Sequence, residues 1–180
     1  MNIAELISIL PPPANPNCNH MNADEWGAIE KKIELTLPNS FKSYINVYGT
    51  GIVGDYICIF NPLSTNPKTN FFYNLEMIIR AERETGDLTL PLFPSNPGLV
   101  PFATTYDGHT LFWHTIGMSD NWPIVVKEVR SENTEEYQMN IVEFLIRILQ
   151  KSEFSQFDKL THSRLLKNYV DGNAPFQVLD

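Results

Sequence analysis

The chain has 180 residues, of which 43% are hydrophobic, 12% aromatic and 19% charged, a composition typical of a folded globular domain and not of a disordered chain. Its 21 acidic and 13 basic residues give a formal net charge of −8, which disfavours direct binding to nucleic acid or anionic membranes. The same charge would attract a basic protein partner, although solubility alone also explains an acidic surface. Because no apolar run is long enough to span a membrane and the start does not resemble a signal peptide, we expect one domain over residues 1–180, located in the cytoplasm.

Three predicted helices begin with the same pattern, an Asn followed three residues later by a Glu, ahead of an apolar stripe. Asn2 begins the first helix, which ends at the prolines that start with Pro11. Asn22 begins the second helix, and Asn140 begins one that we expect over residues 141–151.

The middle of the chain changes from helix to strand after Gly49. Apolar residues at spacings of three and four predict a helix over residues 38–48. Residues 52–60 alternate and are rich in β-branched and aromatic side chains, so we expect one half-buried strand there. A loop over residues 61–70 and a helix over residues 74–84 follow.

The next part of the chain predicts mainly strands. Residues 90–97 contain three prolines and cannot form a central strand. Residues 99–105 and 110–115 predict a β-hairpin, because the Asp107-Gly108 pair between them suits a tight turn.

Further elements complete the fold prediction. We expect Phe112 to be buried in the hairpin, a strand over residues 124–130, a short edge strand near Tyr137, a helix over residues 164–170 and a loose tail over residues 172–180. Helices, then mostly consecutive strands, then helices again are typical of an α+β fold, in which helices pack against a mainly antiparallel sheet.

The motif nearest to a catalytic signature is a run of glycines. Gly49, Gly51 and Gly54 match G-x-G-x-x-G, the dinucleotide-binding fingerprint. That fingerprint needs a strand before it and a helix after it, whereas here a helix precedes it and a strand follows. We therefore interpret these glycines as a turn from helix to strand.

The histidines and cysteines give weak signals for a metal or a catalytic centre. His109 and His114 flank a predicted strand and point to opposite faces, so they cannot share a metal by themselves. Cys18 and His20 could reach one metal, but a solvated loop explains them better because no second ligand pair accompanies them. Asp107 and His109 could form an acid–base pair, although tight turns favour Asp anyway. The sequence therefore predicts no catalytic residue, no metal and no cofactor.

An ordered set of residues resembles one known family. The set comprises Trp26, Ile29-Glu30, Leu37-Pro38, Phe41-Lys42, Tyr44, Tyr48-Gly49, Gly51, Pro101-Phe102-Ala103, Asp107-Gly108, Leu111-Phe112-Trp113, Trp122 and Val125. In order and spacing it resembles the SUKH superfamily, the Smi/Knr-type domain, over about residues 24–149. The resemblance implies an α+β domain, with residues 1–23 as an N-terminal helix and Pro/Asn loop and residues 150–180 as a C-terminal extension.

The resemblance also implies a function without catalysis. Most bacterial members act as immunity proteins that bind and block a cognate polymorphic toxin, often a nuclease, while fungal relatives regulate cell-wall synthesis. The leading hypothesis is therefore an intracellular immunity protein that occludes the active site of a basic toxin. Two alternatives stay open: a regulatory scaffold of the Smi/Knr type, and a hydrolase with its site near residues 107–114.

Carboxylates beside an aromatic side chain are expected on a surface that meets a basic partner. Two stretches have this pattern: Asp120, Asn121 and Trp122 in a loop between strands, and Asp55 with Tyr56 after the glycine turn. We favour the first as the partner-binding site, because loops held by a rigid sheet often carry binding residues. Trp122 could equally plug the end of the core. We expect a charge reversal at Asp120 to change folding stability little.

Two pairs of acidic residues accompany these stretches. Glu82 with Glu84 and Glu135 with Glu136 occur in charged segments, and we interpret both as solvated surface. The first pair could lie near Asp55.

Overall fold

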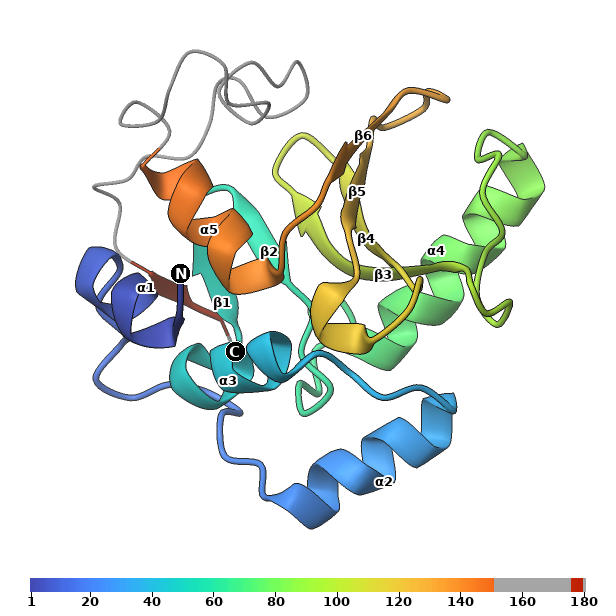
Figure 1. The fold of residues 1–180 in the computed structure, drawn as a ribbon. Coiled ribbons are helices and arrows are strands. Elements are labelled where there is room, and N and C mark those ends of the chain that lie inside the picture. Colours follow the sequence, from blue (N-terminus) through green and yellow to red (C-terminus); the bar gives the residue numbers. More distant parts are fainter. Residues whose placement is uncertain (151–175, 180) are drawn as a thin grey trace.

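Figure 1 shows the computed structural model of the chain, which describes residues 1–150 and 176–179. The elements are α1 (Ile3–Ile9), α2 (Ala23–Ile33), α3 (Asn39–Tyr48), β1 (Gly51–Val53), β2 (Ile57–Ile59), α4 (Phe71–Thr85), β3 (Leu99–Thr105), β4 (Thr110–His114), the 3-10 turn η1 (Ser119–Asn121), β5 (Ile124–Lys127), β6 (Thr134–Tyr137), α5 (Ile141–Leu149) and β7 (Gln177–Val178). The described strands form one antiparallel sheet in the order β6-β5-β4-β3-β2-β1-β7, which confirms the predicted α+β class.

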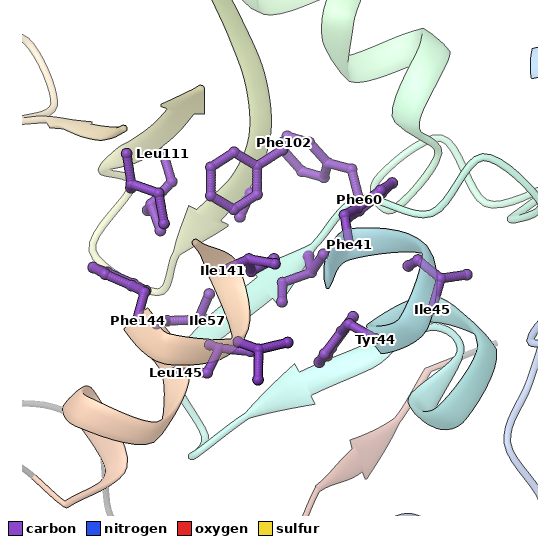
Figure 2. Packing of buried hydrophobic residues seen from close by; sticks show 14 of the residues in the cluster. Phe41, Tyr44, Ile45, Ile57, Phe60, Phe102, Leu111, Ile141, Phe144 and Leu145 are labelled. Carbon is purple, nitrogen blue, oxygen red and sulfur yellow. The ribbon is translucent and has the colours of Figure 1, made fainter. Parts of the chain in front are cut away.

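Successive residues of β4 face two different layers of helix. Phe112 points to the face covered by α4, where it packs with Leu99 and Val125. Trp113 points to the other face, where its ring lies 4.9 Å from that of Phe41 on α3. Figure 2 shows side chains of α3 and α5 directed at β2, β3 and β4 on this second face. The main core therefore lies on this second face, where residues of α1, α3 and α5 pack, and residues of α2 and α4 join the same cluster.

The helix starts follow the predicted caps. Asn2, Asn22 and Asn140 each accept a hydrogen bond from the backbone N–H three residues later. Helix α4 begins at Phe71, three residues before the predicted start, because Asn70 caps it in the same way.

The single strand predicted over residues 52–60 is wrong, because the chain turns back within it. Val53 pairs with Ile57, so β1 and β2 form a hairpin. Gly54, Asp55 and Tyr56 lie between them, and the Tyr56 N–H donates to the Val53 carbonyl at 3.1 Å. Gly54 and Asp55, the two central residues of this turn, have φ angles of 57° and 55°, in the left-handed region. Gly adopts this conformation freely and Asp tolerates it, so the two residues favour a turn. The alternating apolar residues on both sides of the turn indicated one continuous strand instead.

The end of the described chain is not the loose tail that we predicted for residues 172–180. Strand β7 pairs with β1, and Phe176 before it is 7% exposed, with its ring 5.3 Å from that of Tyr48. Gly51 leaves room for this packing, because a Cβ there would lie 2.3 Å from the Phe176 ring. The helix predicted over residues 164–170 lies outside the described residues.

The predicted hairpin of β3 and β4 is confirmed, with Phe112 fully buried. The short strand predicted near Tyr137 is confirmed as β6. The strand predicted over residues 124–130 ends early, at Lys127. Arg130 has a φ of 55° and belongs to the turn that leads into β6.

Candidate functional site

The two stretches singled out in the sequence lie at opposite ends of the strands. Asp55 is in the turn before β2, and Ile57 at the start of β2 pairs with Thr105 at the end of β3. Asp120 lies between β4 and β5, beyond His114, which ends β4 at the other end of the hairpin. The fold therefore does not bring the two stretches together in one surface.

Asp120 caps a helix that is distant in the sequence. Its Oδ1 accepts a hydrogen bond of 2.6 Å from the backbone N–H of Asn39, and its Oδ2 accepts one of 2.8 Å from the Asn39 side chain. Pro38, which precedes α3, makes no side-chain cap of its own. A carboxylate at a helix N-terminus satisfies a free N–H and is stabilised by the helix dipole. Both oxygens of Asp120 are thus engaged in holding α3 against the β4–β5 connection.

We therefore expect substitutions at Asp120 to affect folding, unlike the small effect predicted from the sequence. Asp120→Ala should lower the free energy of unfolding by about 1 kcal/mol, the usual cost of a lost cap. Asp120→Lys should lower it further, since a cation at this end opposes the dipole. Urea unfolding measures both, with Glu132→Ala on an exposed turn as the control. An Asp120→Ala variant as stable as that control would contradict the capping role.

Trp122, the aromatic residue of the same stretch, belongs mainly to the core. It is 5% exposed, its ring centre lies 6.2 Å from that of Trp113, and its Nε1 donates to the Gly117 carbonyl. Beside it lies a depression of about 630 Å³ between the α2–α3 connection and the β4–β5 connection. Asn121 and Met118 are exposed at this end, and Met118 is 73% exposed.

The second stretch is joined to a neighbouring turn. Tyr56 is 3% exposed, and its hydroxyl donates to Oδ2 of Asp107 at 3.0 Å. The backbone N–H of Tyr106 donates to the Tyr56 carbonyl at 2.9 Å. These bonds place the β1–β2 turn, with the exposed Asp55, directly beside the β3–β4 turn.

Two exposed apolar side chains at this end were missed from the sequence. Tyr106 is 86% exposed at the tip of the β3–β4 hairpin, and Val129 is 42% exposed. The Val129 N–H donates to Nδ1 of His109 at 3.2 Å, so the β5–β6 connection joins the same end of the sheet. Tyr106 directly precedes the Asp107-Gly108 pair of the predicted tight turn. A side chain at the tip of a hairpin is expected to be exposed, so this position could have identified Tyr106 from the sequence. We call Asp55, Tyr106, Asp107 and Val129 the turn surface.

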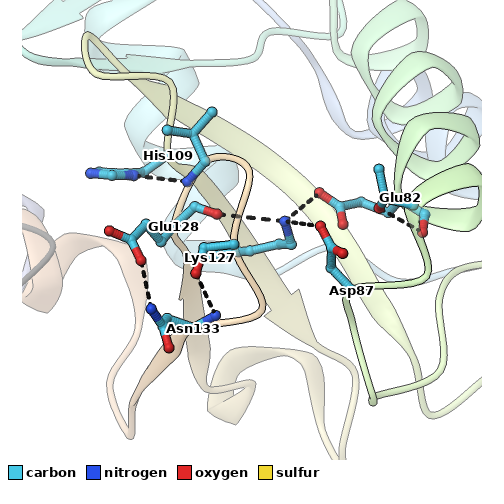
Figure 3. A network of polar contacts seen from close by, with 9 residues as sticks. Glu82, Asp87, His109, Lys127, Glu128 and Asn133 are labelled. Atoms are coloured by element: carbon cyan, nitrogen blue, oxygen red, sulfur yellow. Dashed lines mark hydrogen bonds and ion pairs between the residues drawn. The ribbon is translucent and has the colours of Figure 1, made fainter.

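Glu82 is not solvated, contrary to our interpretation. Figure 3 shows its carboxylate beside Lys127 on β5, at 3.3 Å, with Asp87 at 3.6 Å from the same ammonium group. The Lys127 side chain is 4% exposed and that of Glu82 12%. Strands β4 and β3 separate β5 from β2, and hence Glu82 from Asp55. Glu84 is exposed, as expected.

The candidate acid–base and ligand residues have structural contacts. His109 accepts from the Val129 backbone, whereas Asp107 accepts from Tyr56, so the two are bonded to different groups. His114 Nδ1 lies 3.8 Å from a Glu136 carboxylate oxygen. Within residues 1–150 and 176–179, no group of three or more His, Cys, Asp or Glu side chains could hold a metal ion.

The glycine run forms the predicted turn from helix to strand. Gly49 ends α3 with a φ of 68°, and a Cβ there would lie 2.0 Å from the Asn17 carbonyl oxygen. A helix precedes the run and a hairpin follows it, whereas the dinucleotide fingerprint follows a strand and opens a helix. In the part of the chain that the structure describes, no helix is both long and apolar enough to cross a membrane.

Buried phenol and thiol groups make the fold sensitive to alkali. Burial raises the pKa of Cys58 to about 11, and it raises the pKa values of Tyr44 and Tyr48 above their ordinary range. The unfolded chain ionises these groups first, so the free energy of unfolding should fall as the pH rises above about 9. Urea unfolding at several pH values in this range measures the decrease in the free energy of unfolding. In the Cys58→Ala variant this free energy should decrease less steeply with pH. A Cys58→Ala variant with an unchanged slope would contradict the contribution of the thiol.

Comparison with protein families gives one match. The family model described as SUKH_6: SMI1-KNR4 cell-wall matches residues 23–145, from the first residue of α2 into α5. This span includes the turn surface as well as Asp120, Asn121 and Trp122. The comparisons with curated proteins and with solved structures gave no match.

Proposed function

Because the chain belongs to the SMI1-KNR4 family of the SUKH superfamily, we propose that it is a non-enzymatic immunity protein that binds a cognate toxin in the cytoplasm and blocks the toxin's active site. The expected toxin has a basic surface, as a nuclease does where it holds its substrate. The net charge of −8 supports this choice, since charges of opposite sign speed the encounter of two proteins.

The strongest support from the geometry is the exposed Tyr106 between carboxylates. Interfaces that bind tightly are centred on aromatic side chains, and charges around them guide association. Tyr106 stands at a hairpin tip, with Asp107 next to it and Asp55 on the adjoining turn. These side chains are suited to contact another protein, and their acidity matches a basic one.

The function can be tested with the neighbouring gene. The C-terminal domain of a secreted protein encoded beside this gene is expressed in a host cell, alone and together with this chain. We expect the domain to stop growth when it is alone and the chain to restore growth, with both proteins recovered as one complex. Growth arrest that the chain does not relieve, or the recovery of two separate proteins, would contradict the proposal.

The same test addresses the regulatory alternative, which the cell-wall wording of the family description keeps open. A scaffold of the Smi/Knr type would bind a protein of its own cell and not the neighbouring toxin. We would then expect no rescue of growth, and we would expect deletion of the gene to alter resistance to wall-damaging agents.

A further inference from the structure

The turn surface exposes apolar area that folding does not explain. Tyr106, at 86%, is the most exposed large hydrophobic side chain among the described residues. Val129 is 42% exposed on the adjoining connection, and its Cγ2 lies 3.4 Å from where a Cβ of Gly108 would be. An exposed aromatic ring and an exposed aliphatic side chain on neighbouring turns offer a partner two apolar contacts at the same end of the sheet.

The surface is held in place before any partner arrives. The Tyr106 N–H donates to the Tyr56 carbonyl, and the Tyr56 hydroxyl donates to Asp107. On the other side, the Val129 N–H donates to His109. Because three connections are tied together at the end of one sheet, binding would cost little conformational entropy.

The charge around the two apolar side chains is mostly negative. Asp55 and Asp107 are exposed beside Tyr106, and Glu132 is exposed on the connection that carries Val129. Arg130, on that connection, is also exposed. Three carboxylates against one guanidinium group favour a cationic partner, and the face of the Tyr106 ring can also accept a cation.

The opposite end of the sheet is less suited to a cationic partner. Met118 is 73% and Ile116 51% exposed there, but both oxygens of Asp120 already hold Asn39. Trp122 is 5% exposed, so its ring offers little contact area. The charge of Asp120 thus already serves the cap of α3 within the fold.

We infer that the turn surface is the contact through which this protein binds its toxin, and that the toxin offers Lys or Arg side chains around an apolar pocket that receives Tyr106. This inference rests on the proposed function and adds to it the location of the interface and the chemistry of the partner. From the sequence we favoured the stretch of Asp120, Asn121 and Trp122 as the binding site. The inference favours instead the end of the sheet that carries Asp55.

The experiment compares variants of the full chain for binding to the recombinant toxin domain encoded by the neighbouring gene. Tyr106→Ala should raise the Kd at least about 30-fold, as expected for an interface anchor. Tyr106→Phe keeps the ring and should bind within about threefold of the unmodified chain. Asp55→Asn should slow association at low salt and have little effect at high salt, since exposed charges are then screened.

Met118→Ala, an exposed apolar side chain at the opposite end of the sheet, is the matched control and should leave the Kd unchanged. Equal urea midpoints for Tyr106→Ala and the unmodified chain would show that folding is intact. If Tyr106→Ala binds as tightly as the unmodified chain, the inference is wrong although the proposed function stands. If the unmodified chain itself does not bind, the proposed function fails and the inference with it.

Discussion

Replacing Trp113 by Ala is expected to lower the free energy of unfolding by about 3–5 kcal/mol, which would leave a domain of ordinary stability largely unfolded. Trp113, on β4, is 1% exposed. The centre of its ring lies 4.4 Å from that of Phe102, in a stacked arrangement, and 4.9 Å from that of Phe41, in a T-shaped one. Truncation would remove these contacts and leave a cavity between the sheet and α3, which rigid strands can fill only in part.

The measurement is urea unfolding, followed by circular dichroism. Trp113→Phe should cost less than Trp113→Ala, because it keeps a ring beside Phe102. Tyr73→Ala removes an aromatic ring that is 49% exposed on α4 and is the matched control, with an expected change of roughly 0.5 kcal/mol or less. A loss below about 1 kcal/mol for Trp113→Ala would show that the ring is not at the centre of the core.

Replacing Lys127 by Met should lower the free energy of unfolding by about 3 kcal/mol, because one partner of a buried ion network is removed. The Lys127 ammonium group lies between the carboxylates of Glu82 and Asp87 and close to the Glu128 carbonyl (Figure 3). Without the cation, Glu82 would stay 12% exposed with no opposite charge next to it. The loss of stability should therefore come mainly from the carboxylates that stay buried without a cation, and less from the lost attraction between Lys127 and these carboxylates.

A second variant separates these two causes. Lys127→Met combined with Glu82→Leu should recover part of the lost stability, since an apolar pair of similar volume can replace a buried ion pair. Lys31→Met, at an exposed position on α2, is the matched control and should change stability by at most about 0.5 kcal/mol. A double variant no more stable than Lys127→Met would contradict the unpaired carboxylate as the cause.

The helices could be predicted because their signals are local. The Asn at the start of α1, α2 and α5 lies three residues from the N–H that it binds, so one short segment of sequence contains the whole cap. The β1–β2 hairpin was missed although its signal is also local. Gly54 and Asp55 stand inside an alternating segment, and the alternation indicated a longer strand.

The contacts that decide the candidate site are not local, and the sequence could not show them. Asp120 caps α3 from 81 residues away, so its pattern in the sequence is that of an ordinary exposed loop. Strand β7, which follows Phe176, pairs with β1, although the two strands are far apart in the sequence. The bond from Tyr56 to Asp107 joins residues that are 51 positions apart and places Tyr106 and Asp55 on adjoining turns.

The central claim is that this chain acts by binding a toxin and not by modifying it, and titration of the toxin's activity tests this claim most directly. A fixed amount of the recombinant toxin domain is mixed with increasing amounts of the full chain, at concentrations far above the Kd, and the remaining toxin activity is measured. We expect activity to fall linearly and to reach zero at a fixed molar ratio, independent of the time of mixing. Loss of activity that continues with time at a small fraction of that ratio would show turnover and would contradict the account.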